Sequence, residues 1–113
     1  MKYESVLPIA KEQAEKAFHG RDAEEIVHAL LSVTHHDADW EWVQDHCLGF
    51  LDSPLSNVRT TAIICLGHLA RIHKELDRPK VLAALNPLRA DPECRAHVED
   101  AIEDIDMFTD EPV

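Results

Sequence analysis

The chain has 113 residues, 45% of them apolar and 29% charged, with a formal net charge of -11 at pH 7. A chain of this length forms one domain with a real core, because it buries roughly two-thirds of its unfolded surface. No apolar run reaches the roughly 18 residues of a membrane span, and the start lacks a signal-peptide segment, so we expect a cytoplasmic protein. The odd number of cysteines predicts buried thiols rather than disulfides at Cys47, Cys65 and Cys94.

Apolar residues recur at helical spacing through the first half of the chain, without an alternating strand pattern. The helices predicted there cover about 6–18, 23–34 and 39–51. Pro8 is tolerated in the first turn of the first helix, and Asp22 and Asp39 are expected to cap the next two. The segment His35–Ala38 is expected to be a loop.

The second half predicts three more helices, over about 56–73, 77–88 and 91–107. Ser56 and Asp77 are the expected starts of the first two, and Asp91 opens the last. The buried stripe predicted for the helix after Ser56 is Val58, Ala62, Cys65, Leu66, Leu69 and Ile72. One domain, 1–113, therefore contains three antiparallel hairpins, at about 5–36, 39–75 and 77–107, and a frayed acidic tail at 108–113.

Two stretches that begin at Asp52 and Asp91 have nearly the same pattern. An offset of 36 residues places Arg59 over Arg95. The same offset aligns the apolar pairs Ala62 and Val98, Leu66 and Ile102, and Leu69 and Ile105. A two-helix repeat of about this period is typical of a solenoid, a fold that usually binds a partner along one face.

The motif Asp-x-Pro-x-x-x-Val-Arg-x-x-Ala-x-x-x-Leu-Gly-x-Leu, from Asp52 to Leu69, resembles the second-helix signature of HEAT repeats. The resemblance implies an all-α fold, a short α-solenoid of about three HEAT-like antiparallel helix hairpins, with six helices. Gly67 costs about 1 kcal/mol relative to Ala inside a helix, so it predicts close contact with a neighbouring helix. The resemblance also implies a ladder between neighbouring repeats, formed by Asp52, Arg59, Asp91 and Arg95.

The whole chain also resembles small bacterial HEAT-like immunity proteins of polymorphic or contact-dependent toxin systems. The segments that carry this resemblance are 40–44, 65–73 and the acidic end of the chain. It implies a protein that binds and neutralises a cognate toxin without catalysing a reaction.

Charge is unevenly placed along the chain. Residues 1–52 carry a net charge of -7, residues 53–90 carry +4 and residues 91–113 carry -8. Acidic ends disfavour nucleic acid and favour a cationic protein, and nuclease toxins are cationic because they hold phosphate backbones. No basic residue after Arg95 balances the carboxylates of the last helix. The alternative is that this charge only keeps a small protein soluble.

Eight histidines suggest metal or catalytic chemistry, but their spacing does not support it. The group from His35 to Asp39 lacks a second ligand cluster, and Cys65 and His68 are expected to point in different directions. No histidine is followed by Glu, the pair that HEAT-fold hydroxylases use to hold iron. We therefore expect no enzyme activity, no metal and no cofactor.

Candidate partner-binding residues come from three helices. Trp40 shares an apolar stripe and is expected in the core, which leaves Trp42 either as a contact residue or packed on the first hairpin. The full predicted set is Trp42, Thr61, Ile64, His68, Arg71, Glu99, Glu103 and Asp106.

The sequence thus predicts a non-catalytic protein-binding module, and the resemblance implies an immunity protein for a basic toxin of the nuclease class, in the cytosol. It is expected to be a monomer when free and to bind neither nucleic acid nor membrane. Two alternatives stay open: a general HEAT-like scaffold or accessory subunit, and a small repeat enzyme with a ligand or metal at the face of His68 and Arg71.

Overall fold

The computed structural model describes residues 7–109, which form six α-helices and a short 3-10 helix, without a strand. The elements are α1 (Lys11–Phe18), α2 (Ala23–His36), α3 (Trp40–Phe50), α4 (Ser56–His73), α5 (Arg78–Leu85), η2 (Asn86–Ala90) and α6 (Arg95–Phe108). The predicted all-α fold is confirmed. Within this part of the chain, no helix is both long enough and apolar enough to traverse a bilayer.

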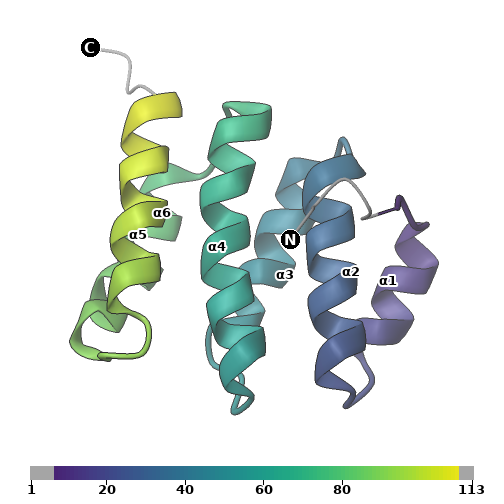
Figure 1. Ribbon diagram of the computed structural model, residues 1–113. Coiled ribbons are helices and arrows are strands. Elements are labelled where there is room, and N and C mark those ends of the chain that lie inside the picture. The colour runs from purple at the N-terminus through teal and green to yellow at the C-terminus, as the bar shows by residue number, and fades with distance from the viewer. Residues whose placement is uncertain (1–6, 110–113) are drawn as a thin grey trace.

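The helices α2, α4 and α6 lie side by side in one layer (Figure 1), and α4 packs on both of its neighbours. In the same view α3 and α5 lie behind this layer, while α1 flanks α2. Short turns fold α1 back on α2 and α3 back on α4, so that the second helix of each pair faces the same side. The layer of α2, α4 and α6 therefore presents one continuous helical surface.

The centre of the core is α4, which is buried on more of its circumference than the sequence predicted. Its buried residues are Val58, Ala62, Ile63, Cys65, Leu66, Gly67, Leu69 and Ala70. Ile72, predicted to be buried, is 39% exposed. The buried arc is rotated toward Ile63 and Ala70, which leaves Ile72 beyond the opposite edge of the stripe. All three cysteines are free and buried, as predicted.

Aspartates begin three of the helices, as the sequence predicts. The Asp22 carboxylate accepts hydrogen bonds from the amides of Glu24 and Glu25, at 2.9 and 3.3 Å. The Asp39 carboxylate accepts a hydrogen bond from the amide of Trp42 at 3.2 Å, and that of Asp77 accepts one from the amide of Lys80 at 3.3 Å. Each bond satisfies an amide that has no partner inside the helix.

Two predicted boundaries in the first half were wrong. α1 begins at Lys11, so Pro8 precedes the helix instead of lying in its first turn, while the predicted start at Val6 lies outside the described residues. His35 and His36 form the last turn of α2 rather than a loop. The ring of His35 stabilises this extra turn, because its Nδ1 hydrogen bonds to the Leu31 carbonyl at 2.9 Å.

Boundaries in the second half also differ from the prediction. Ser56 does not cap α4; it is the first helical residue after Leu55, and its hydroxyl donates to Glu93 Oε2 at 2.5 Å. α5 ends at Leu85, where Pro87 forces the chain into the 3-10 turn η2. α6 begins at Arg95 rather than near Asp91, because the residues between them form a turn.

The end of α6 is fixed by an arginine from α5. Arg78 donates to Asp106 Oδ1 at 2.8 Å and to the Thr109 carbonyl at 3.3 Å. Thr109 is buried and Phe108 is half-buried in the helix, so the first two residues of the predicted tail, 108–113, are not frayed. Residues 110–113 lie outside the described part.

Candidate protein-binding surface

A groove of about 350 Å³ lies between α4 and α6, on the layer that α2, α4 and α6 form. Its lining residues are Ile64, Gly67, His68, His97, Asp100, Ala101, Glu103 and Asp104. Three of the predicted contact residues, Ile64, His68 and Glu103, come together here. His97 and Asp100 were not among the predicted contact residues, although positions 97, 100, 101 and 104 share one helical face.

Gly67 determines how closely the two helices approach. A Cβ atom at this position would lie 3.1 Å from Ala101 Cα and 3.3 Å from Ala101 Cβ. The predicted close contact is therefore confirmed, and its partner is the backbone of α6. Gly67 and Ala101 line the groove together with Ile64, and these three residues are called its apolar floor.

His68, half-buried on α4, is held as a neutral imidazole. Its Nδ1 lies 2.7 Å from Arg71 Nη2, and because a guanidinium only donates, Nδ1 accepts and the proton of the neutral ring is on Nε2. Burial first, and then the charges of Arg71 and His35, lower the pKa of His68 to about 4, while Asp104 opposes the shift. The ring is therefore uncharged at neutral pH.

A row of polar side chains crosses the layer from α2 to α6. The rings of His35 and His68 have centroids 5.4 Å apart, and Arg71 Nη1 lies 3.9 Å from Asp104 Oδ2. The row contains two imidazoles, one cation and one carboxylate, and two of its members, His68 and Asp104, also line the groove. It can donate and accept hydrogen bonds and offer charge to a partner.

The acidic face of α6 has two parts. Glu99, Asp100 and Glu103 are exposed and form no ion pair within residues 7–109. Asp106 is paired with Arg78 at 2.8 Å. No basic residue follows Arg95 in the sequence, but two cations from earlier in the chain face this helix: Arg78 pairs with Asp106, and Arg71 lies 3.9 Å from Asp104. Neither Glu99 nor Asp106 lines the groove.

Thr61 and Trp42 lie apart from this groove. Thr61 is half-buried on α4. Trp42 packs on the first hairpin, with its ring centroid 6.3 Å from that of Phe18 and its Nε1 donating to Glu15 Oε2 at 3.2 Å. Lys11 Nζ lies 5.0 Å from the Trp42 ring centroid. Trp42 is thus packed on the first hairpin and half-buried, and its contact with a partner stays a prediction.

The predicted ladder has a different acidic partner. Arg59 Nη2 donates to Glu93 Oε1 at 2.6 Å, and Arg59 Nη1 donates to the Ser53 carbonyl at 2.8 Å. Its partner is thus neither Asp52, which is exposed, nor Asp91. Asp91 is used locally, because its Oδ1 accepts the amide of Glu93 at 2.9 Å, and the longer Glu93 side chain reaches Arg59.

Arg95 was the fourth predicted member of the ladder. It is exposed, and its Nε donates to the Arg89 carbonyl at 3.1 Å. This bond lies within the third hairpin, so Arg95 does not link neighbouring hairpins. The ladder is reduced to one inter-hairpin ion pair.

One group of three side chains within residues 7–109 is close enough to share a metal ion: Asp91, Glu93 and Cys94. Glu93 in this group is already bound by Ser56 and Arg59, and Asp91 stabilises the turn. The group contains neither His68 nor the residues from His35 to Asp39. These existing bonds favour a structural role for the group.

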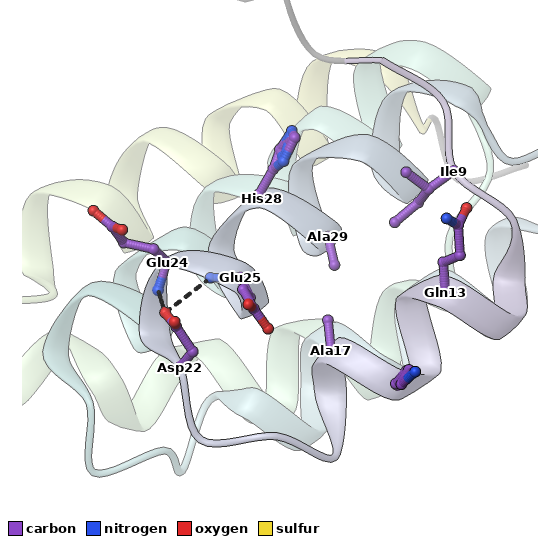
Figure 2. Close-up of a pocket in the computed structure, with 9 residues that line it drawn as sticks. Ile9, Gln13, Ala17, Asp22, Glu24, Glu25, His28 and Ala29 are labelled. Carbon is purple, nitrogen blue, oxygen red and sulfur yellow. Dashed lines mark hydrogen bonds between the residues drawn. The ribbon is translucent and has the colours of Figure 1, made fainter.

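A larger hollow of about 730 Å³ lies between α1 and α2 (Figure 2). Figure 2 shows Ala17 and Ala29 facing each other across it, with Asp22, Glu24 and Glu25 gathered at one end. Asp22 is engaged there as the cap of α2. None of the residues that the sequence singled out for binding lines this hollow.

Comparison with solved structures finds a chain of similar fold. No protein-family model matches the chain, and no curated protein matches it. The chain is similar to one in the crystal structure of a CDI (contact-dependent inhibition) complex from Cupriavidus taiwanensis LMG 19424, with a TM-score of 0.83 and 28% sequence identity. The similarity covers 96% of both chains. Assignment to HEAT repeats stays a prediction from the motif.

Proposed function

We propose that this protein is a non-catalytic immunity protein that binds a toxin and neutralises it. The observation that carries the proposal is the similarity, over 96% of both chains, to a component of a contact-dependent inhibition complex. We infer that such a complex pairs a toxin with the protein that neutralises it. Similarity at 28% identity and a TM-score of 0.83 extends to the whole arrangement of helices.

Charge favours the immunity component over the toxin component. The chain has a net charge of -11, and exposed carboxylates lie along α6 at Glu99, Asp100 and Glu103. A toxin that cleaves nucleic acid needs the opposite charge. We therefore propose a cationic toxin domain, of the nuclease class, as the partner, and the cytosol as the place where the two meet.

A binding role also accounts for the groove better than catalysis does. Its lining consists of neutral His68, His97, the carboxylates Asp100, Glu103 and Asp104, and the apolar floor. This set offers charge and shape complementarity, and we propose that it acts without a cofactor. The scaffold and repeat-enzyme alternatives have no specific observation in their favour.

Coexpression with the cognate toxin tests the proposal. The C-terminal domain encoded by the neighbouring upstream reading frame is induced in a bacterial host with or without this protein. We expect growth arrest by the domain alone, rescue by coexpression, and a stable complex on size-exclusion chromatography. Full toxicity in cells that contain the folded protein, together with no complex in vitro, would refute the proposed function.

A further inference from the structure

We propose that the groove between α4 and α6 receives an arginine side chain of the toxin partner. The methylene stem lies on the floor of Ile64, Gly67 and Ala101, and the guanidinium meets Asp100 and Glu103 at the rim. This inference rests on the proposed function, because it needs a protein partner. It adds the point of recognition and the residue type that is recognised.

The shape of the groove suits one long side chain. Its volume of about 350 Å³ is many times that of a single water, and it is bounded by two helices in close contact. Half-buried Ile64 and buried Ala101 supply apolar surface below the polar rim. Arginine combines an apolar stem with a charged head, so the stem can pack on the apolar floor while the head meets the carboxylates at the rim.

The charge of the groove favours a cation. Three carboxylates line it, and Arg71 lies 3.9 Å from one of them, Asp104. Asp100 and Glu103 are exposed and have no ion pair with any described residue. A planar guanidinium can bridge two carboxylates through separate N–H groups, which an ammonium does with less directionality.

Arg71 shows that a guanidinium reaches this site. Its side chain is 46% exposed, and its 3.9 Å separation from Asp104 leaves room for a closer donor. Its other nitrogen is bound to His68 at 2.7 Å, which holds Arg71 at one end of the row. A partner arginine would therefore add to the acidic rim without displacing the bond between Arg71 and His68.

His68 does not oppose a cation here. His68 is neutral at physiological pH, since its pKa is lowered to about 4. Its ring and that of His97 line the groove, and a flat imidazole offers a face on which a guanidinium can stack. The larger hollow between α1 and α2 is less suited to a cation, because Lys16 lines it and Asp22 is committed to the cap of α2.

Peptide titration tests the inference without the toxin. The probe is the blocked pentapeptide Gly-Gly-Arg-Gly-Gly, and the control probes carry lysine or uncharged citrulline in place of arginine. At about 20 mM salt, we expect arginine-dependent amide shifts confined to the residues that line the groove. Binding of the lysine peptide should be several-fold weaker, and the citrulline peptide should cause no shift at these residues.

The variant Asp100→Asn/Glu103→Gln should weaken arginine-peptide binding about fivefold or more, because it removes both rim carboxylates. The matched control, Glu24→Gln/Glu25→Gln, removes the same charge at the other hollow and should leave binding unchanged, with the fold of both checked by circular dichroism. The inference would be overturned if both variants lost arginine-peptide binding equally, or if the lysine peptide bound as well as the arginine peptide. Amide shifts spread over all acidic helices would also overturn it.

The same pair of variants separates this inference from the proposed function. In binding measurements with the toxin domain, Asp100→Asn/Glu103→Gln should reduce affinity about tenfold relative to the control pair. If wild type binds the toxin and the groove variant binds equally well, the inference fails and the immunity function stands. If wild type does not bind the toxin, the function fails, and the peptide titration still decides whether the groove recognises arginine.

Discussion

Arg59 Nη2 and Glu93 Oε1 lie 2.6 Å apart and join the second hairpin to the turn that precedes α6. Glu93 also accepts the Ser56 hydroxyl, while Arg59 also donates to the Ser53 carbonyl. These bonds lower the pKa of Glu93, chiefly through Ser56 and then through Arg59. A small network therefore fixes the orientation of the third hairpin on the second at this end.

We predict that Arg59→Ala lowers the melting temperature more than Glu93→Gln does, because it also removes the bond to Ser53. The melting temperature of the double variant should fall by less than the sum of the two single decreases, since both changes remove the same interaction. Arg95→Ala, which removes a bond within one hairpin, is the control and should change little. Strict additivity of the two losses would contradict the predicted coupling.

The network also predicts a pH effect. Because the folded-state pKa of Glu93 is depressed, its contribution is present above the ordinary carboxyl range and is lost as pH falls through the lowered pKa. The difference in melting temperature between wild type and Glu93→Gln should therefore shrink on acidification. Melting curves recorded from neutral pH downward measure it, and a constant difference would rule out a titrating Glu93.

Two helical glycines predict opposite responses to alanine. At Gly49 a Cβ atom would meet nothing within 4 Å, so Gly49→Ala should stabilise the protein by about 0.5–1 kcal/mol through helix propensity. At Gly67 the added Cβ would lie 3.1 Å from Ala101 Cα, a backbone atom that cannot rotate away. Overpacking destabilises a core by about 1–3 kcal/mol, whereas the higher helix propensity of alanine stabilises by about 1 kcal/mol. Gly67→Ala should therefore destabilise the protein by about 1 kcal/mol. Urea denaturation measures both, and stabilisation by Gly67→Ala would show that α6 can move away.

His68 predicts a loss of stability in mild acid. Its pKa of about 4 in the folded state is below the ordinary histidine value, so the unfolded chain binds the proton first. Stability should fall as pH drops from about 7 to about 5, where most carboxylates stay ionised. The groups that face His68 are His35, Arg71 and Asp104.

The variant His68→Gln should reduce this dependence on pH, as measured by urea midpoints at several pH values. It should not abolish it, because burial beside Phe18 and Trp42 also lowers the pKa of His46. Identical slopes for wild type and His68→Gln would mean that His68 takes up its proton equally in both states.

Local signals predicted most of the fold. Asp22, Asp39 and Asp77 begin helices as their residue type indicates, because a short carboxylate bonds the adjacent amides in any tertiary context. The same rule predicted Ser56 as a helix cap, and this prediction was wrong, since the Ser56 hydroxyl bonds Glu93, a residue 37 positions away. Long-range partners of this kind have no local signature.

The groove illustrates the same limit at the candidate site. The candidate set predicted from the sequence included Ile64 and His68 on α4, and Gly67 indicated a close neighbour. Which residues of α6 face this part of α4 depends on the rotation of one helix against the other. This rotation brings Asp100 and Asp104 to the groove and leaves Glu99 outside it.

The pairing of Asp106 with Arg78 decides which carboxylates can test electrostatic attraction. A change at Asp106 would also break the bond that fixes the end of α6, so the test uses Glu99, Asp100 and Glu103. Replacing these three with Lys should slow association with the toxin domain about tenfold at low salt, because a single-sign patch accelerates encounter with a cation.

The wild-type association rate should itself fall as salt is added, since exposed charges are screened. The control triple, Glu12→Lys, Glu41→Lys and Glu75→Lys, makes the same change in net charge at exposed positions on other segments and should slow association less. Stopped-flow measurements at several salt concentrations compare the three proteins. If association ignores both the α6 triple change and ionic strength, the acidic face of α6 serves as a solubilising end of the helical layer and not as an attractor for the toxin.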